Sequence, residues 1–241
     1  MYLFFAGLLL TGCVGPKQEA RAASQYTLGT AYYREGSIEL SIETLENAVK
    51  LDPRNWKARS ALGVVYIAKG QPELAEKSLK AAVRMAPDSA EALSNYGTFL
   101  LAEGRSKEAL EMFQAALNDL EYRNPAMVLS NMSAALLAEG RPEDGLRMAE
   151  EAVRRAPSLC SGYRQIGTIQ EHLHNVPKAL DAYARLAQAC PSEALGARRL
   201  AGCAQVQAGN TDLGLAVLEQ VIEEGQGTDE EQKARACLGR N

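Results

Sequence analysis

The sequence is poor in the residues that most often carry out chemistry. It contains only two histidines, His172 and His174. Residues two apart on a helix point in different directions, so this pair cannot share a metal ion. The sequence also has no glycine-rich phosphate loop, no G-x-S-x-G nucleophile elbow and no H-E-x-x-H zinc motif. These absences predict a protein that is not an enzyme and that uses no cofactor, no metal ion and no small-molecule substrate.

An excess of positive charge is missing too. The chain has 26 Lys and Arg residues against 30 Asp and Glu residues, a net charge of -4. The basic surface that supplies most of the affinity for nucleic acids is therefore not expected, and neither is a nucleic-acid partner. Glycine (20) and proline (9) are too few for a collagen-like or disordered chain, and 46% apolar residues is typical of a folded protein.

The apolar run at the N-terminus is short. Residues 2–10 as a helix, at about 1.5 Å per residue, would reach only about half of a roughly 30 Å hydrocarbon core, so this run does not span a bilayer. It ends in Leu10-Thr11-Gly12-Cys13, which resembles the lipobox of bacterial lipoproteins, in which the cysteine carries a lipid. On this interpretation residues 1–12 are a signal peptide and residues 13–21 a lipidated, unstructured tether. The alternative is an ordinary buried N-terminal helix.

A 34-residue period organises the rest of the chain. Gly29, Gly63 and Gly97 recur at that spacing, as do Gly36, Gly70 and Gly104. Leu-Gly-x-x-Tyr early in the period, with proline near its end, is typical of tetratricopeptide repeats. The first glycine lets two helices approach closely, and the second ends the first helix in the left-handed conformation. The sequence therefore predicts an all-α fold, a right-handed tetratricopeptide superhelix with six helix-turn-helix repeats and a C-terminal capping helix.

The predicted repeats fill residues 22–228. Their ranges are 22–55, 56–89, 90–123, 126–159, 160–193 and 195–228. The third repeat lacks its terminal proline, so its second helix is expected to run on or bend at residues 119–122. In the fifth repeat, His174 occupies the position of the turn glycine. A capping box, Thr228-x-x-Glu231, predicts the start of the capping helix over residues 229–241.

Four cysteines lie in the C-terminal part of the chain, an even number in a compartment that would be oxidising if the lipobox is real. Cys160 opens the fifth repeat and Cys190 closes it, so an antiparallel helix pair brings both to the same end. Cys203 and Cys237 are 34 residues apart, hence at equivalent places on neighbouring helices. Two disulfides, Cys160 with Cys190 and Cys203 with Cys237, are predicted. The alternative is four buried, reduced thiols that pack as small hydrophobic side chains.

In a tetratricopeptide superhelix, the first helix of each repeat lines the concave face. The repeat positions that point into this face offer apolar side chains in the first four repeats, together with small ones such as Ser60 and Ser130. In the last two repeats they offer charge, as at Arg164, Glu171 and Arg199. An exposed apolar groove usually binds a segment of another protein. The predicted groove contacts are Tyr26, Tyr33, Val64, Ile67, Leu101 and Leu137, with Asn95 and Asn131 as hydrogen-bond donors to an extended backbone. The alternative is that these residues only pack against neighbouring helices.

The stretch from residue 93 to 131 narrows the interpretation. It contains Asn95-Tyr96-Gly97-x-Phe99-Leu100, then Gly104-Arg105, Glu108-Ala109 and Phe113, and soon after Asn131. This stretch is similar to the central part of the type IV pilus pilotins, the lipoproteins of the PilF, PilW and Tgl type. The resemblance implies a lipid-anchored protein on the periplasmic face of the outer membrane, which binds secretin subunits and promotes their targeting and assembly into multimers. A generic periplasmic scaffold that recruits other envelope proteins, for example cell-wall enzymes, would use the same fold and anchor.

Overall fold

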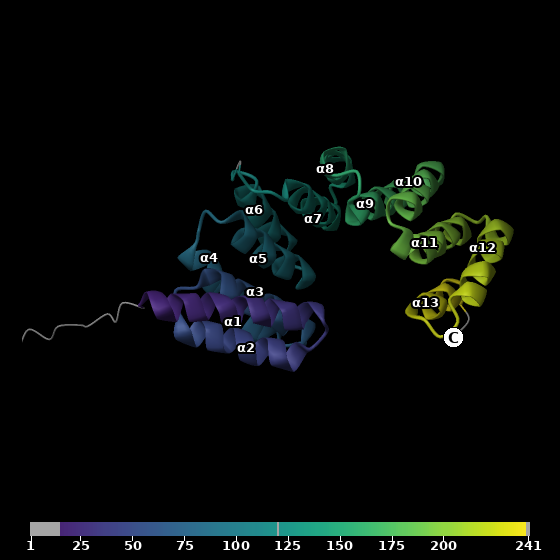
Figure 1. Cartoon of the computed structure of the whole chain (residues 1–241). Helices are drawn as coiled ribbons and strands as arrows, with labels where there is room; N and C mark the ends of the chain where they lie inside the picture. Colours follow the sequence, from purple (N-terminus) through teal and green to yellow (C-terminus); the bar gives the residue numbers. More distant parts are fainter. Residues whose placement is uncertain (1–14, 120, 240–241) are drawn as a thin grey trace, which may run out of the picture. The chain divides into compact units, whose positions relative to one another are not determined.

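The computed structural model describes residues 15–119 and 121–239, and in these residues all regular structure is helical (Figure 1). Thirteen α-helices and one short 3-10 helix follow one another there, without a strand. None of the described helices is both long and apolar enough to cross a membrane. The chain divides into two compact units, residues 1–99 and 100–241, which are described in turn.

The first unit is built from two helix pairs and the greater part of a fifth helix. Its helices are α1 (Pro16–Arg34), α2 (Ile38–Leu51), α3 (Trp56–Ala68), α4 (Pro72–Met85) and, up to residue 99, α5 (Ala90–Ala102). Within each pair a glycine meets a fully buried leucine. A Cβ atom at Gly29 would lie 2.7 Å from Cγ of Leu45, and one at Gly63 would lie 2.5 Å from Cγ of Leu79. The predicted role of these two glycines in close helix packing is therefore confirmed.

The first helix begins earlier than predicted. Residues 13–21 were expected to form an unstructured tether, whereas α1 begins at Pro16. A proline suits the first helical position because its missing N–H would have no partner there, and Glu19 in the first turn favours the helix start electrostatically. Ala22, one turn later, is fully buried and fixes this end of the helix. Cys13 and the signal peptide predicted over residues 1–12 lie outside the described residues.

The second unit continues the alternation of first and second helices. After the end of α5 it contains α6 (Ser106–Ala116), α7 (Pro125–Ala138), α8 (Pro142–Arg155), α9 (Cys160–His172), α10 (Val176–Ala189), the 3-10 helix η1 (Pro191–Glu193), α11 (Ala194–Gln207), α12 (Thr211–Glu224) and α13 (Asp229–Cys237). Each helix from α6 to α13 packs on the next, and α13 also packs on α11. The core between α9, α10 and α11 is centred on Tyr183 and Leu186.

Helix α6 is shorter than the sequence suggested. The second helix of the third repeat was expected to run on or bend at residues 119–122, but α6 ends at Ala116. The Oδ1 atom of Asp119 accepts a hydrogen bond from the backbone N–H of Glu121 at 3.0 Å. Aspartate and asparagine side chains bond to nearby backbone groups in turns, and Asn118-Asp119 thus competes with the helix. A turn therefore separates α6 from α7. The two residues by which the chain exceeds the 34-residue period here, Asn124 and Pro125, are the N-cap and the first residue of α7.

The turn glycines behave as predicted, and so does their one substitute. Gly36, Gly70, Gly104 and Gly140 have φ angles of 70° to 78°, in the left-handed region. His174 has a φ of 55° at the equivalent position of the fifth repeat, and among the described residues it is the one non-glycine with a positive φ. The register of the repeat therefore imposes the conformation, even on a residue that is less suited to it.

The end of the second unit is closed by α13 and two disulfides. The side chain of Thr228 accepts a hydrogen bond from the backbone N–H of Glu231, as the capping box predicts, and α13 ends at Cys237. Cys160 is bonded to Cys190, with 5.9 Å between the Cα atoms, and Cys203 is bonded to Cys237, with 5.6 Å between them. The pairing is the one expected from the repeat geometry. The second disulfide ties α13 to α11.

Candidate partner-binding surface

In the first unit, two large apolar side chains of the first helices reach the surface. Tyr33 of α1 is 36% exposed and Ile67 of α3 is 38% exposed, and they occupy the same repeat position, 34 residues apart. Val64, one turn before Ile67, is half-buried. Three predicted groove residues are thus accessible, although Val64 is less so than the other two.

The other two predicted groove residues of this unit are engaged within the protein. The Nδ2 atom of Asn95 on α5 donates a hydrogen bond to Oγ of Ser60 on α3, at 3.0 Å. Tyr26 on α1 is half-buried, and burial raises the pKa of its hydroxyl, with the carboxylate of Glu91 on α5 adding to the effect. Asn95 therefore links two helices, instead of presenting its whole amide to an extended backbone as predicted.

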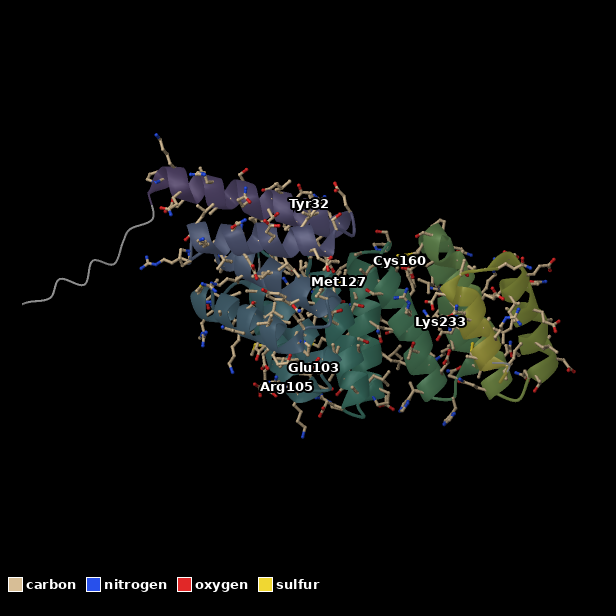
Figure 2. The ribbon with its side chains drawn as sticks, turned by 90° about the horizontal axis from the view of Figure 1, so that it is seen from below. Tyr32, Glu103, Arg105, Met127, Cys160 and Lys233 are labelled. Atoms are coloured by element: carbon tan, nitrogen blue, oxygen red, sulfur yellow. A yellow bond between two sulfur atoms is a disulfide. The ribbon has the colours of Figure 1, made fainter. Side chains whose placement is uncertain are left out.

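In the second unit the predicted leucines are half-buried, and a methionine is more accessible. Leu101 lies in the last turn of α5 and Leu137 in the last turn of α7, and both are partly exposed, as is Asn131. Met127, at the start of α7, is 43% exposed (Figure 2). Its Sδ atom lies 4.0 Å from Oγ of Ser161 on α9, the helix that begins at Cys160. This unit thus presents a smaller apolar area on its first helices than the sequence suggested.

One of the repeat positions predicted to face the groove has a structural role. Ser60 and Ser130 occupy it in the second and fourth repeats and are almost completely buried, at 0% and 1% exposure. Ser60 accepts from Asn95 as described, and Ser130 donates to Oγ of Ser161 on α9 at 2.9 Å. Small residues recurring at this position were the signal that helices approach closely here. The prediction that these serines line the groove is therefore wrong.

Charged residues replace these serines in the last two repeats and keep the linking role. Arg164 of α9 forms an ion pair with Glu193 of η1. Arg199 of α11 forms one with Glu230 of α13, with 2.6 Å between Nε and Oε2, and both side chains are less than one-third exposed. The guanidinium groups predicted to line the groove thus link elements that are separated by one helix along the chain. Their charge is already compensated.

Among the charged residues predicted to line the groove, Glu171 has the most unusual environment. It is half-buried on α9, and burial raises the pKa of its carboxyl. A hydrogen bond donated by the Tyr183 hydroxyl and the charge of Arg199 act in the opposite direction. Tyr183 is 1% exposed, so its hydroxyl has no access to a substrate. In the described residues no group of three or more His, Cys, Asp and Glu side chains is placed to hold a metal ion.

Comparisons with known proteins agree with this architecture. A tetratricopeptide repeat profile matches residues 66–125 and 132–194, and a second tetratricopeptide profile matches residues 32–94. No functionally curated protein matches the sequence significantly.

Several solved structures have the same fold. PilF of Pseudomonas aeruginosa shares 22% sequence identity over 91% of this chain and 99% of its own, with a TM-score of 0.73. PilW, a widely conserved type IV pilus biogenesis factor, shares 20% over 88% of this chain and 96% of its own, with a TM-score of 0.80. YrrB, a tetratricopeptide protein with an unusual peptide-binding site, shares 18% over 81% and 99%, with a TM-score of 0.54. At these identities the likeness establishes the fold. Since the first profile alone covers more than half of the residues, and the helices pair with the same 34-residue period, the chain belongs to the tetratricopeptide repeat family.

Proposed function

We propose that this protein is a pilotin of type IV pili, a non-enzymatic outer-membrane lipoprotein that binds secretin subunits and promotes their targeting and multimer assembly. The observation that supports this best is the extent of the likeness to PilF and PilW. The matched regions cover 99% and 96% of those two chains and about nine-tenths of this one. A shared tetratricopeptide fold of unrelated function would not need to match in length as well as in helix packing.

The proposed anchor is a lipid on Cys13, at the periplasmic face of the outer membrane. Only Val14 and Gly15 separate Cys13 from the first residue of α1, Pro16. An extended chain spans at most about 3.5 Å per residue. The lipid would therefore hold the start of the first unit within roughly 10 Å of the bilayer surface.

The proposed partner-binding residues are the accessible apolar side chains of the first helices. Tyr33 and Ile67 in the first unit, and Leu101 and Leu137 in the second, lie at one position of the 34-residue repeat, allowing for the two-residue insertion. Apolar segments of secretin subunits would bury these side chains on each unit. Because the lipid confines the protein to the membrane, each bound subunit would be delivered at a raised local concentration, which favours multimer formation without any chemical step.

Two experiments test this proposal. Metabolic labelling with palmitate should mark the wild-type protein and leave the Cys13→Ala variant unlabelled, and equal labelling of both would remove the anchor. Deletion of the gene should abolish the heat-resistant secretin multimers seen on immunoblots. If the wild-type protein takes up palmitate but the deletion strain still forms normal multimers, the alternative is favoured: a generic periplasmic scaffold that recruits other envelope proteins.

A further inference from the structure

The charge of this acidic protein is unevenly distributed. Two segments of the first unit, residues 16–25 and 47–59, contain six basic residues and two acidic ones, a net charge of +4 in a chain whose net charge is -4. The first segment is the start of α1, and the second runs from the end of α2 into the start of α3. These two segments together are called the basic end below.

The fold brings the two segments together. Helices α1 and α2 lie side by side along their lengths (Figure 1). Arg21 of α1 and Lys50 of α2 line one hollow between the helices, together with the amide side chains of Gln18, Gln25 and Asn47. Cations and amides from both helices thus converge on one surface. Such a surface suits phosphate oxygens, which accept hydrogen bonds from both kinds of group.

Most cations of the basic end have no carboxylate partner in the described part of the chain. Lys17, Arg21, Lys50, Arg54 and Lys57 are all exposed, and none of them forms an ion pair within residues 15–119 and 121–239. Many other basic residues, such as Arg164 and Arg199, are paired with carboxylates. A row of unpaired cations costs stability through mutual repulsion unless an anionic partner covers it.

The single tryptophan of the chain also lies in the basic end. Trp56 is the first residue of α3 and is partly exposed, with Nζ of Lys57 5.6 Å from the centre of its ring. Tryptophan is enriched where proteins meet the headgroup region of a membrane, because its ring is apolar and its N–H is polar. A partly exposed tryptophan beside a lysine, in segments that carry further unpaired cations, is the combination expected of a membrane-facing surface.

We infer that the basic end binds the surface of a bilayer that contains anionic phospholipids. The inference deepens the proposed function, since it rests on the lipid anchor at Cys13, three residues before α1 begins. The anchor would bring the basic end to the headgroups, and the cations would hold α1 and α2 against them. A lipid chain and a basic patch together bind a membrane more firmly than either alone. The first unit would then be oriented at the membrane instead of hanging from a free tether.

Vesicle binding by the unlipidated chain tests the inference. We would use residues 13–241 with Cys13→Ser, which retains every described helix, and follow Trp56 fluorescence. Vesicles of phosphatidylcholine with phosphatidylglycerol should bind the protein and shift the emission to shorter wavelength, whereas phosphatidylcholine alone should not. A cation near an anionic membrane contributes about 1 kcal/mol, which corresponds to about fivefold in affinity. Arg21→Gln with Lys50→Gln should therefore weaken binding about 25-fold, and high salt should abolish it.

The matched control changes the net charge equally, at two lysines of the second unit that are not part of the basic end. Lys107 on α6 and Lys178 on α10 are exposed and form no ion pair in the part of the chain that the structure describes, so Lys107→Gln with Lys178→Gln should leave vesicle affinity within about twofold. Equal weakening by both pairs would show that only total charge matters, and would overturn the inference. So would absence of binding to anionic vesicles, or release by millimolar inorganic phosphate at constant ionic strength, which would indicate a small-anion site. Because no secretin is present, these results are independent of the pilotin proposal.

Discussion

Replacing Gly167 by alanine tests how tightly the two helices of the fifth repeat are packed. A Cβ atom at this position of α9 would lie 2.2 Å from Cε1 of Tyr183 and 2.6 Å from its Cζ. Real Cβ atoms do not approach other atoms so closely, so the ring would have to move. Tyr183 is fully buried in the core formed with Leu186, and its hydroxyl donates to Glu171, which leaves it no free space.

The expected cost follows from three contributions. Alanine gains about 1 kcal/mol over glycine in a helix interior. Overpacking of a dense core costs about 1–3 kcal/mol, and a lost hydrogen bond to a charged acceptor costs about 1.5–3 kcal/mol. The net effect of Gly167→Ala is a destabilisation of about 1.5–5 kcal/mol. Gly196→Ala, in α11, is the matched control, because the three atoms nearest to its Cβ would all belong to the Glu230 side chain, at 3.3–3.4 Å. That variant should be unchanged or more stable by up to about 1 kcal/mol.

Urea denaturation of the oxidised protein measures both effects. Far-ultraviolet circular dichroism follows all helices, whereas the fluorescence of Trp56 reports on the first unit. Gly167→Ala should therefore lower the urea midpoint measured by circular dichroism more than the midpoint measured by fluorescence. In a Tyr183→Leu background, Gly167→Ala should lose most of its cost, since the ring atoms it meets are gone. A stability of Gly167→Ala equal to that of wild type would refute this account of the helix contact.

Three further changes have defined expectations. His174→Gly should stabilise the protein by about 1 kcal/mol in urea denaturation, because glycine adopts the left-handed conformation without strain; a loss of stability would contradict this. Cys203→Ser with Cys237→Ser should cost about 3–4 kcal/mol for a loop of 34 residues and should remove hydrogen-exchange protection from α13, in which Ala234 alone is fully buried; four free thiols in denatured, unreduced wild type would disprove the bonds. Burial raises the pKa of Glu171, so the folded chain holds this proton more tightly than the unfolded chain, and stability should fall as pH rises through the raised pKa. Glu171→Gln should lack this fall, and an unchanged pH profile would be the contrary result.

The sequence predicts the helix pairs well because glycine and proline encode their turns directly. The register was strong enough to place His174 at a left-handed position. The sequence could not show that Ser60 is buried. Its position lies between the concave face and the next helix, and whether it is covered depends on the sizes of the side chains that surround it. The start of α1 was missed because a lipoprotein tether and the first turn of a helix have similar compositions over a few residues.

The basic end was also hidden at the level of sequence. Its cations are separated by about 30 residues between Arg21 and Lys50, and the net charge of -4 gives no sign of them. Only the antiparallel pairing of α1 with α2 gathers them on one surface. Local charge patterns are informative along one helix, whereas a patch shared by two helices needs the fold.

The most direct test of the proposed function is complementation of the deletion strain with face-specific variants. Ile67 and Leu74 are 38% and 42% exposed, on α3 and on α4, so glutamate at either position should be tolerated by the fold. A carboxylate buried without a partner costs several kcal/mol of binding. If the first helices hold the secretin segment, immunoblots should show heat-resistant secretin multimers with wild type and Leu74→Glu, and none with Ile67→Glu at equal protein level. Full multimers with Ile67→Glu would contradict the claim that this surface binds the secretin.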